Sequence, residues 1–428
     1  MKSPNDNTYG GIARVTFLVY LFFIFFGTSM PFQDRAEEVD DISTSNVVNQ
    51  IVFTTLFLTS TACLFHKREK LFSFIKREKF LTLFLVWCTL SAFWSEYSFV
   101  SFKRLFQTFT TVTVSLAFLL DVANSDEALN YLKWIVYLYI PLTALSIVFI
   151  PGAIDPVHFT WRGLAVGKNY LGQAAIVSII IAFFAMKSAT AWEKPISLLI
   201  LIISVVLLFG AKSTTSILTF AIIIMLGVIR TLDEFFVPLS IGRAFSIASL
   251  LFVIGVILSV HCLAPHAFNA IPQYFGKDIS FTGRTDLWTD IFTQTKRHWL
   301  LGWGFAGFWV VGHPPVMQLY EEYIWLPNQA HLGYLDIWNE TGLVGLLLFC
   351  AMVISYSIGL AKLKRPHFWN WILISALILN LQESTLFKQN LLTGVMFIFA
   401  YLALHAELLQ RERAVRFSPL SADFHKSP

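Results

Sequence analysis

Long apolar segments constrain the fold of this chain more than any other feature. Stretches of about 20 mostly apolar residues, enough to cross a bilayer as a helix, recur about twelve times. They lie near residues 13–30, 47–65, 79–94, 105–123, 131–150, 170–186, 195–210, 213–229, 245–263, 331–360, 368–383 and 389–405. Apolar residues form 56% of the 428 and charged residues only 14%, more apolar surface than a soluble core hides. The sequence therefore predicts an all-α polytopic membrane protein.

Composition excludes several classes of function. The net charge of +4 provides no bulk basic field for a nucleic-acid partner. The four cysteines each lie in an apolar run, without the spacing of a metal site or a disulfide framework. The acidic run 37–41 could hold a divalent cation, but adjacent acids in a loop are more often a solvated turn. We predict neither a metal nor a cofactor.

Basic residues predict how the chain is oriented. Lys and Arg gather in the segments that face inward if the N-terminus is cytoplasmic, above all in residues 66–79. The acidic run 37–41 then lies outside, and both termini lie in the cytoplasm. The first segment resembles a signal peptide, but its long apolar stretch lacks a nearby A-x-A site. It is predicted to stay as an uncleaved anchor.

One long connection divides the chain. We expect an N-terminal transmembrane region at 1–263 with about nine spans and a C-terminal one at 331–410 with about three. Between them, residues 264–330 form a loop outside the membrane that is rich in Trp, Pro and Gly, and residues 411–428 form a cytoplasmic tail. Because the loop is too aromatic for disorder, we predict short helices over the membrane face, one at 284–298 capped by Thr282.

Cations assigned to the outer side are few, and several stand in glycine-rich or hydroxyl-rich clusters. The cluster 161–173 holds Arg162, Lys168 and Asn169, which suit phosphate oxygens or, alternatively, anchor the chain at the lipid headgroups. The cluster 211–216 places Lys212 before four hydroxyl residues. That pattern fits an anion site or an ordinary helix cap.

Two further clusters follow in and after the long loop. Arg284 stands beside a glycine and could clamp a phosphate or pair with a nearby aspartate. His331 stands where the loop enters a span, with Tyr334 on the same helical face and Asp336 and Glu340 beyond. Histidine suits proton transfer near neutral pH, although a lone histidine at a span end is more often structural.

In this order, the clusters resemble the O-antigen ligase and polysaccharide polymerase superfamily of bacterial inner-membrane proteins. The resemblance rests on R-G-L with K-N-x-L-G, the Ser/Thr-rich turn, T-G-R-T-x-x-W, G-W-G-F and H-x-x-Y-L-D-x-x-x-E-T-G-L-x-G. It covers roughly residues 80–360. Trp94-Ser95-Glu96 with Ser101 and Arg104 also resembles the exopolysaccharide polymerase branch. Gly167 and Leu332 stand where family members often have His and Asn.

The resemblance implies a glycosyltransferase with C-type architecture that uses a polyprenyl-diphosphate-linked glycan donor and no metal. Arg162 and Arg284 would hold the diphosphate, and His331 would activate the acceptor hydroxyl. Lys168, Asn169, Lys212 and Tyr334 would help to bind substrate. The acceptor would be another lipid-linked glycan in a polymerase or lipid A core in a ligase, and a flippase and a chain-length regulator are the expected partners.

We expect the polymerase, acting on the periplasmic face, with the ligase as its alternative. A flippase or transporter ranks third, because such folds commonly carry internal repeats and none is evident in this sequence.

Overall fold

The computed structural model describes residues 4–26, 47–122, 124–236, 284–363, 367–388 and 391–416. In these ranges the regular elements are helices, as predicted. They are α1 (Pro4–Phe26), α2 (Val47–His66), α3 (Arg68–Arg77), α4 (Phe80–Ser91), α5 (Ser98–Leu119), α6 (Ser125–Phe149), η1 (Pro151–Ala153), α7 (Lys168–Ser188), α8 (Glu193–Gly210), α9 (Thr214–Phe236), α12 (Arg284–Arg297), α13 (Pro314–Glu322), α14 (Gly333–Ala361), α15 (Phe368–Leu379) and α16 (Leu392–Arg416).

Each predicted span that is described in whole or in part contains a helix, although the helix in the span predicted at 368–383 ends at Leu379. Seven of these helices are long and apolar enough to cross a membrane, namely α1, α2, α6, α7, α8, α14 and α16. Apolar stretches in α4, α9 and α15 are shorter, and α5 is interrupted by Ser, Thr, Lys and Arg. The predicted span 245–263, the acidic run 37–41 and Thr282 lie outside the described residues. The chain is therefore a multi-pass helical membrane protein.

Helix α16 forms the core of the bundle and is the most buried of the seven candidate spans. It packs against α5, α7, α14 and α15. Phe397, Phe399 and Tyr401 are all but fully buried in it. A helix that is apolar on all sides must be surrounded by others, which explains its central place. It continues to Arg416, past the boundary predicted at residue 410.

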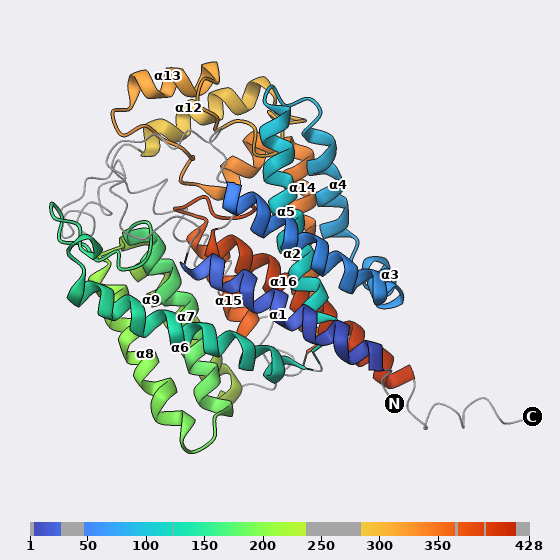
Figure 1. Cartoon of the computed structure of the whole chain (residues 1–428). Helices are drawn as coiled ribbons and strands as arrows, with labels where there is room; N and C mark the ends of the chain where they lie inside the picture. Colours follow the sequence, from blue (N-terminus) through green and yellow to red (C-terminus); the bar gives the residue numbers. More distant parts are fainter. Residues whose placement is uncertain are drawn as a thin grey trace, which may run out of the picture.

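Helices α12 and α13 cover one end of the bundle, where α14 begins (Figure 1). They confirm the prediction of short helices in the long loop. Gly342 interrupts α14 with φ of 68° and ψ of −176°. A Cβ atom at this glycine would lie 2.2 Å from the carbonyl oxygen of Leu300. Glycine here lets the segment after α12 pack directly on the backbone of α14.

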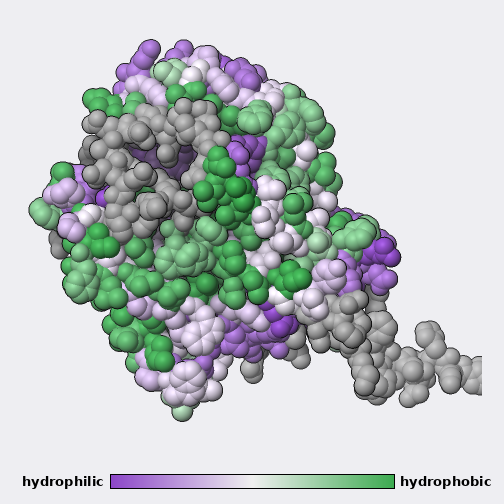
Figure 2. Space-filling model, in the orientation of Figure 1, coloured by the Kyte–Doolittle hydropathy of each residue, from purple (hydrophilic) through white to green (hydrophobic). Residues whose placement is uncertain are grey.

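Helix α16 finishes at the opposite end of the bundle (Figure 1), and the basic last turn of α3 packs there. Arg77 of α3 forms an ion pair with Glu412, and Arg413 donates to Ser73 Oγ at 2.9 Å. Figure 2 shows apolar side chains over the middle of the visible face, with hydrophilic ones over α12, α13 and α3. The surface thus has an apolar zone between two polar zones, as a bilayer requires.

Candidate active site

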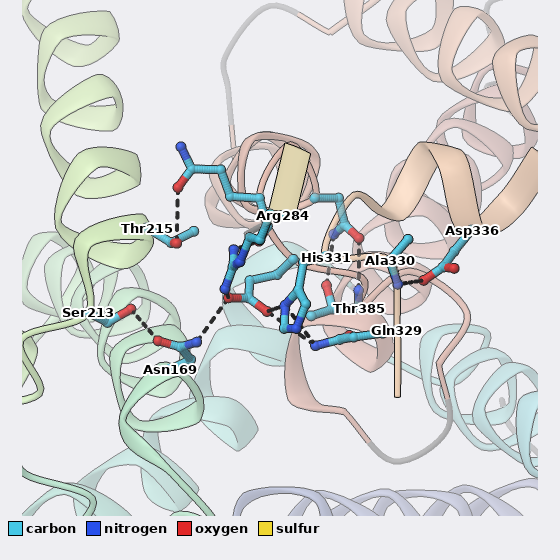
Figure 3. Close-up of polar contacts among 12 residues, drawn as sticks. Asn169, Ser213, Thr215, Arg284, Gln329, Ala330, His331, Asp336 and Thr385 are labelled. Carbon is cyan, nitrogen blue, oxygen red and sulfur yellow. Dashed lines mark hydrogen bonds and ion pairs between the residues drawn. The ribbon is translucent and has the colours of Figure 1, made fainter. Parts of the chain in front are cut away.

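The carboxylate of Glu383 is the centre of a polar cluster beneath α12. Its Oε1 accepts a hydrogen bond from Asn169 Nδ2 at 2.9 Å and lies 3.4 Å from Arg284 Nη2. Its Oε2 lies 3.1 Å from His331 Nδ1 and accepts from Gln329 Nε2 at 3.3 Å. These five residues are the Glu383 cluster, and Figure 3 shows the four labelled members converging. The cluster unites a cation, an imidazole and a buried anion.

The members of the cluster come from the ends of separate helices. Asn169 lies in the first turn of α7, Arg284 begins α12, and Gln329 and His331 precede α14. Glu383 follows α15 in the turn toward α16. These segments are the ones that the basic-residue pattern assigns to the outer side, so tertiary packing gathers loops far apart in sequence at one place.

The turn that carries Glu383 is held by one buried asparagine. Asn380 Oδ1 accepts from the backbone N–H groups of Thr385 and Leu386 at 2.8 and 3.1 Å. Its carbonyl accepts from Gly333 N at 2.9 Å, which joins the turn to the start of α14. Arg284 Nη1 donates to the carbonyl of Gln382 at 2.6 Å. These bonds fix Glu383 relative to both His331 and Arg284.

The hydroxyl-rich turn before α9 supports the cluster from the other side. Ser213 Oγ donates to Asn169 Oδ1 at 3.0 Å, so that the Asn169 amide group presents its N–H to Glu383. Thr215 Oγ1 donates to Gln382 Oε1 at 3.0 Å. Both contacts are drawn in Figure 3. The hydroxyls for which the sequence left open an anion site or a helix cap thus orient the residues around Glu383.

His331 combines backbone strain with access to solvent. Its φ of 52° lies in the left-handed region, which costs energy for a residue other than glycine and recurs at functional sites. Its side chain is 15% exposed, against 4% for Glu383. The ring of Trp325 lies 5.7 Å from the His331 ring, between centroids. The imidazole is therefore held from one side by Glu383 and open on another.

Glu383 is an anion near neutral pH. Burial raises the pKa of its carboxyl, but the hydrogen bond from His331 and the charge and hydrogen bond of Arg284 oppose burial, and the pKa lies below its ordinary value. The stability that this shift contributes is present at neutral pH and is lost as the pH falls through the lowered pKa. A carboxylate only accepts hydrogen bonds, so His331 Nδ1 is the donor. Its Nε2 is left to accept a proton.

A second buried cluster lies along the first turns of α14. Lys388 Nζ lies 3.1 Å from Glu340 Oε1 and 3.7 Å from Asp336 Oδ2. Asp336 Oδ1 accepts from Trp309 Nε1 at 2.7 Å, and Glu340 Oε2 accepts from the N–H of Ala306 at 3.1 Å. Because Lys388 follows Glu383 in the same turn, this pairing ties the turn to α14 and to the loop after α12.

Two sequence motifs meet at that loop. Arg104 of α5 donates to the carbonyls of Ala306 and Trp309. A Cβ atom at Gly304 would lie 2.5 Å from Ser95 Cβ, so a larger residue cannot fit there. The Trp-Ser-Glu and Gly-Trp-Gly-Phe motifs therefore form one contact that positions the loop beneath α12 and α13.

The other predicted site residues make contacts of their own. Arg162 Nε donates to the carbonyl of Gly152, and Tyr334 donates its hydroxyl to the carbonyl of Leu377 at 2.7 Å. Lys212 is exposed in the left-handed region, with φ of 49°. Lys168 begins α7, one residue before Asn169. Within the described ranges, hydrogen bonds and ion pairs join Asn169, Arg284 and His331 to Glu383 but do not include Arg162, Lys168, Lys212 or Tyr334.

Glu383 itself was not predicted from the sequence. A signal existed, because Glu383 and Gln382 end an apolar segment on the side assigned to the exterior. An ionisable residue at membrane depth is a functional candidate whichever charge it carries. The prediction applied this rule only to cations, and so it named the residues that surround the carboxylate but not the carboxylate.

Comparison with known proteins agrees with the motifs. Residues 198–350 match the family model described as O-Antigen ligase, a range that contains Arg284 and His331. The chain is also 28% identical over 293 residues to the exopolysaccharide production protein ExoQ of Rhizobium meliloti (strain 1021). That alignment covers 66% of this chain and 64% of the relative, just under two thirds of its length. Together, these matches show that the chain is similar to proteins of the O-antigen ligase and polymerase superfamily, in agreement with the motif resemblance.

Proposed function

We propose that the chain is a membrane glycosyltransferase that polymerises polyprenyl-diphosphate-linked oligosaccharide repeat units into exopolysaccharide on the periplasmic face. The observation that carries the proposal is the Glu383 cluster, which places an arginine and an oriented histidine around one buried carboxylate. The family match supports glycan transfer, and the name of the relative supports exopolysaccharide production.

Charge distribution supports the periplasmic side for this site. The end of the bundle away from the Glu383 cluster carries Arg77 and Arg413, together with Lys67, whose Nζ lies 2.7 Å from Asp121. Basic residues mark the cytoplasmic side of membrane proteins. The start of α1 and the end of α16 lie at this basic end (Figure 1), which supports a cytoplasmic position for both helix ends.

His331 supplies the general base in this mechanism. Glu383 holds Nδ1–H, and Nε2 accepts the proton of the acceptor hydroxyl as its oxygen bonds to the anomeric carbon of the donor. The bond from that carbon to the diphosphate breaks, and the diphosphate leaves with the electron pair. A positioned base of this kind contributes about 10²–10⁴-fold to the rate.

Arg284 stabilises the charge that develops on the leaving diphosphate. Two of its N–H groups are directed at Gln382 and Glu383, which orients the guanidinium plane and leaves other donors for phosphate oxygens. Fixed donors in a site with little water are worth more than the same groups in solution. The roles of Arg162, Lys168 and Lys212 remain predictions from the resemblance.

The alternative is an O-antigen ligase, which uses the same chemistry on a different acceptor. Purified protein supplied with lipid-linked donor and either a second lipid-linked glycan or lipid A core separates the two. Growth of lipid-linked polymer supports our proposal. Transfer to lipid A core alone would replace it with the ligase.

Replacing Arg284 by lysine should abolish most of the transfer activity. Lysine keeps the positive charge but loses the planar fork that contacts Gln382 and Glu383 and presents further donors to a diphosphate. The initial rate of glycan transfer by purified protein measures the effect. Arg297→Lys, an exposed change at the far end of α12, should leave the rate unchanged. Equal activity of Arg284→Lys and the wild type would reduce Arg284 to a simple charge.

Replacing Trp325 by alanine should weaken acceptor binding about tenfold, measured as the acceptor concentration that gives half of the maximal rate. The Trp325 ring is 43% exposed and stands beside His331, where its apolar face can pack on an acceptor sugar. The maximal rate should change less. Trp299→Ala, which removes a similarly exposed ring, is the control. The same acceptor dependence in both variants would exclude Trp325 from the binding site.

A further inference from the structure

A polar cavity of about 570 Å³ opens between α3, α14 and α16. Helix α14 begins beside the Glu383 cluster at Gly333, and its last turn, with Lys362 just beyond it, lines this cavity. The cavity is therefore at the other end of the bundle, on the side that the basic residues assign to the cytoplasm. No step of the proposed glycan transfer uses it.

Cations dominate the walls of the cavity. Among the described residues that line it, Lys76, Arg77, Lys362 and Arg413 are basic, and Glu412 is acidic. Glu412 forms an ion pair with Arg77. Among the described lining residues, no other carboxylate remains to compensate the positive charges of Lys76, Lys362 and Arg413. Clustered cations repel one another unless an anion lies between them. The cavity therefore favours a ligand with negative charge.

Two buried nitrogens in the wall lack partners. His405 is 4% exposed, and its Nε2 has no hydrogen bond, its approach to Glu78 Oε2 being 3.9 Å. Arg77 Nε is also buried without an acceptor. Both atoms lie just beneath the surface of the cavity, so they add to the polar character of its wall, while the accessible groups of Lys76, Lys362 and Arg413 are the ones that face a ligand. Phosphate oxygens accept strongly from arginine and are the acceptors that such a wall would hold best.

The surface around the cavity indicates that the phosphate belongs to a lipid. Helix α3 is short, with charged residues along one face and with Phe72 and Ile75 exposed at 60% and 37%. A helix of this kind lies in the plane of the membrane interface. Ile358 of α14, which lines the cavity, is 58% exposed. Apolar surface for acyl chains thus continues directly into the cationic cavity.

We propose that this cavity binds the phosphate group of an anionic phospholipid of the cytoplasmic leaflet, with its acyl chains along α3 and α14. Basic pockets between membrane helices on this side bind such headgroups. The bound lipid would join α3 to the ends of α14 and α16.

Native mass spectrometry of the full-length protein tests this proposal. The protein is taken from micelles with equal fractions of phosphatidylglycerol or phosphatidylcholine, and the retained lipid is counted. Changing Lys76 and Lys362 together to glutamine should weaken phosphatidylglycerol binding about thirtyfold. Binding of phosphatidylcholine should not change.

Two further variants separate a specific site from general attraction or misfolding. Lys187→Gln with Lys194→Gln removes the same charge from the same predicted side outside the cavity, and should retain the lipid. Lys76→Arg with Lys362→Arg keeps the charge and should retain it too. Equal loss in the first control, or equal binding of both lipids to the wild type, would overturn the proposal. So would full displacement by glycerol phosphate at the lipid's own concentration, which would identify a soluble phosphate as the ligand.

Discussion

Replacing His331 by alanine should lower the rate of glycan transfer by about 10²–10⁴-fold while the protein still inserts in the membrane. The variant loses the nitrogen that takes the acceptor proton, and it loses the donor to Glu383 Oε2 at 3.1 Å. The initial rate and the length distribution of the polymer, measured with lipid-linked donor, report the effect. Polymer of normal length would remove His331 from the mechanism.

A second variant separates the chemistry of His331 from its backbone strain. Because φ is 52° at this position, alanine adds strain of its own, whereas asparagine tolerates the left-handed region. His331→Asn also keeps a side-chain donor for Glu383 but has no basic nitrogen, so it should be as inactive as the alanine variant. His158→Ala, an exposed change in another loop, should be fully active. An active asparagine variant would show that His331 acts only by shaping the backbone.

Replacing Glu383 by glutamine should lower the transfer rate by a similar factor of about 10²–10⁴. Donors face both oxygens of the carboxylate: Asn169 and Arg284 at Oε1, and His331 and Gln329 at Oε2. Glutamine offers one oxygen and one N–H₂ group, so one pair of donors would face another donor. His331 would lose the acceptor that fixes its tautomer, and Arg284 would lose its anion.

Rescue distinguishes a positioning role from simple loss of folding. Glu383→Asp keeps the charge on a shorter side chain and should recover part of the activity that Glu383→Gln loses. Glu321→Gln removes an exposed carboxylate on α13 and should behave as the wild type. Full activity of Glu383→Gln would mean that Glu383 is a packing residue and that His331 is oriented by other groups.

Much of the fold follows from local sequence. Apolar stretches of spanning length predict helices at 331–360 and 389–405, where α14 and α16 lie. The short helix predicted at 284–298 is α12. Arg284, His331 and Asn169 could be named because their types and neighbours suit phosphate and proton transfer, and all three contact one carboxylate.

In the clusters 161–173 and 211–216, the structure shows that residues beside the cations contact the Glu383 cluster. In these two clusters the sequence prediction rested mainly on the cations Lys168 and Lys212, whereas the contacts to the Glu383 cluster come from Asn169 and Ser213. Successive residues of a helix point about 100° apart. Lys168 and Asn169, adjacent in the first turn of α7, therefore face different surroundings, and composition cannot tell which one faces inward.

The sequence by itself determined that this chain is a helical membrane protein with a polar minority at the ends of its spans, because bilayer thickness dictates both the length and the apolar character of each segment. Only the tertiary structure decided that Glu383 is the partner of His331, 52 residues away. That pairing depends on how the turn after α15 packs against the start of α14, through Asn380 and Gly333. Such contacts between distant segments have no period or spacing that a single sequence displays.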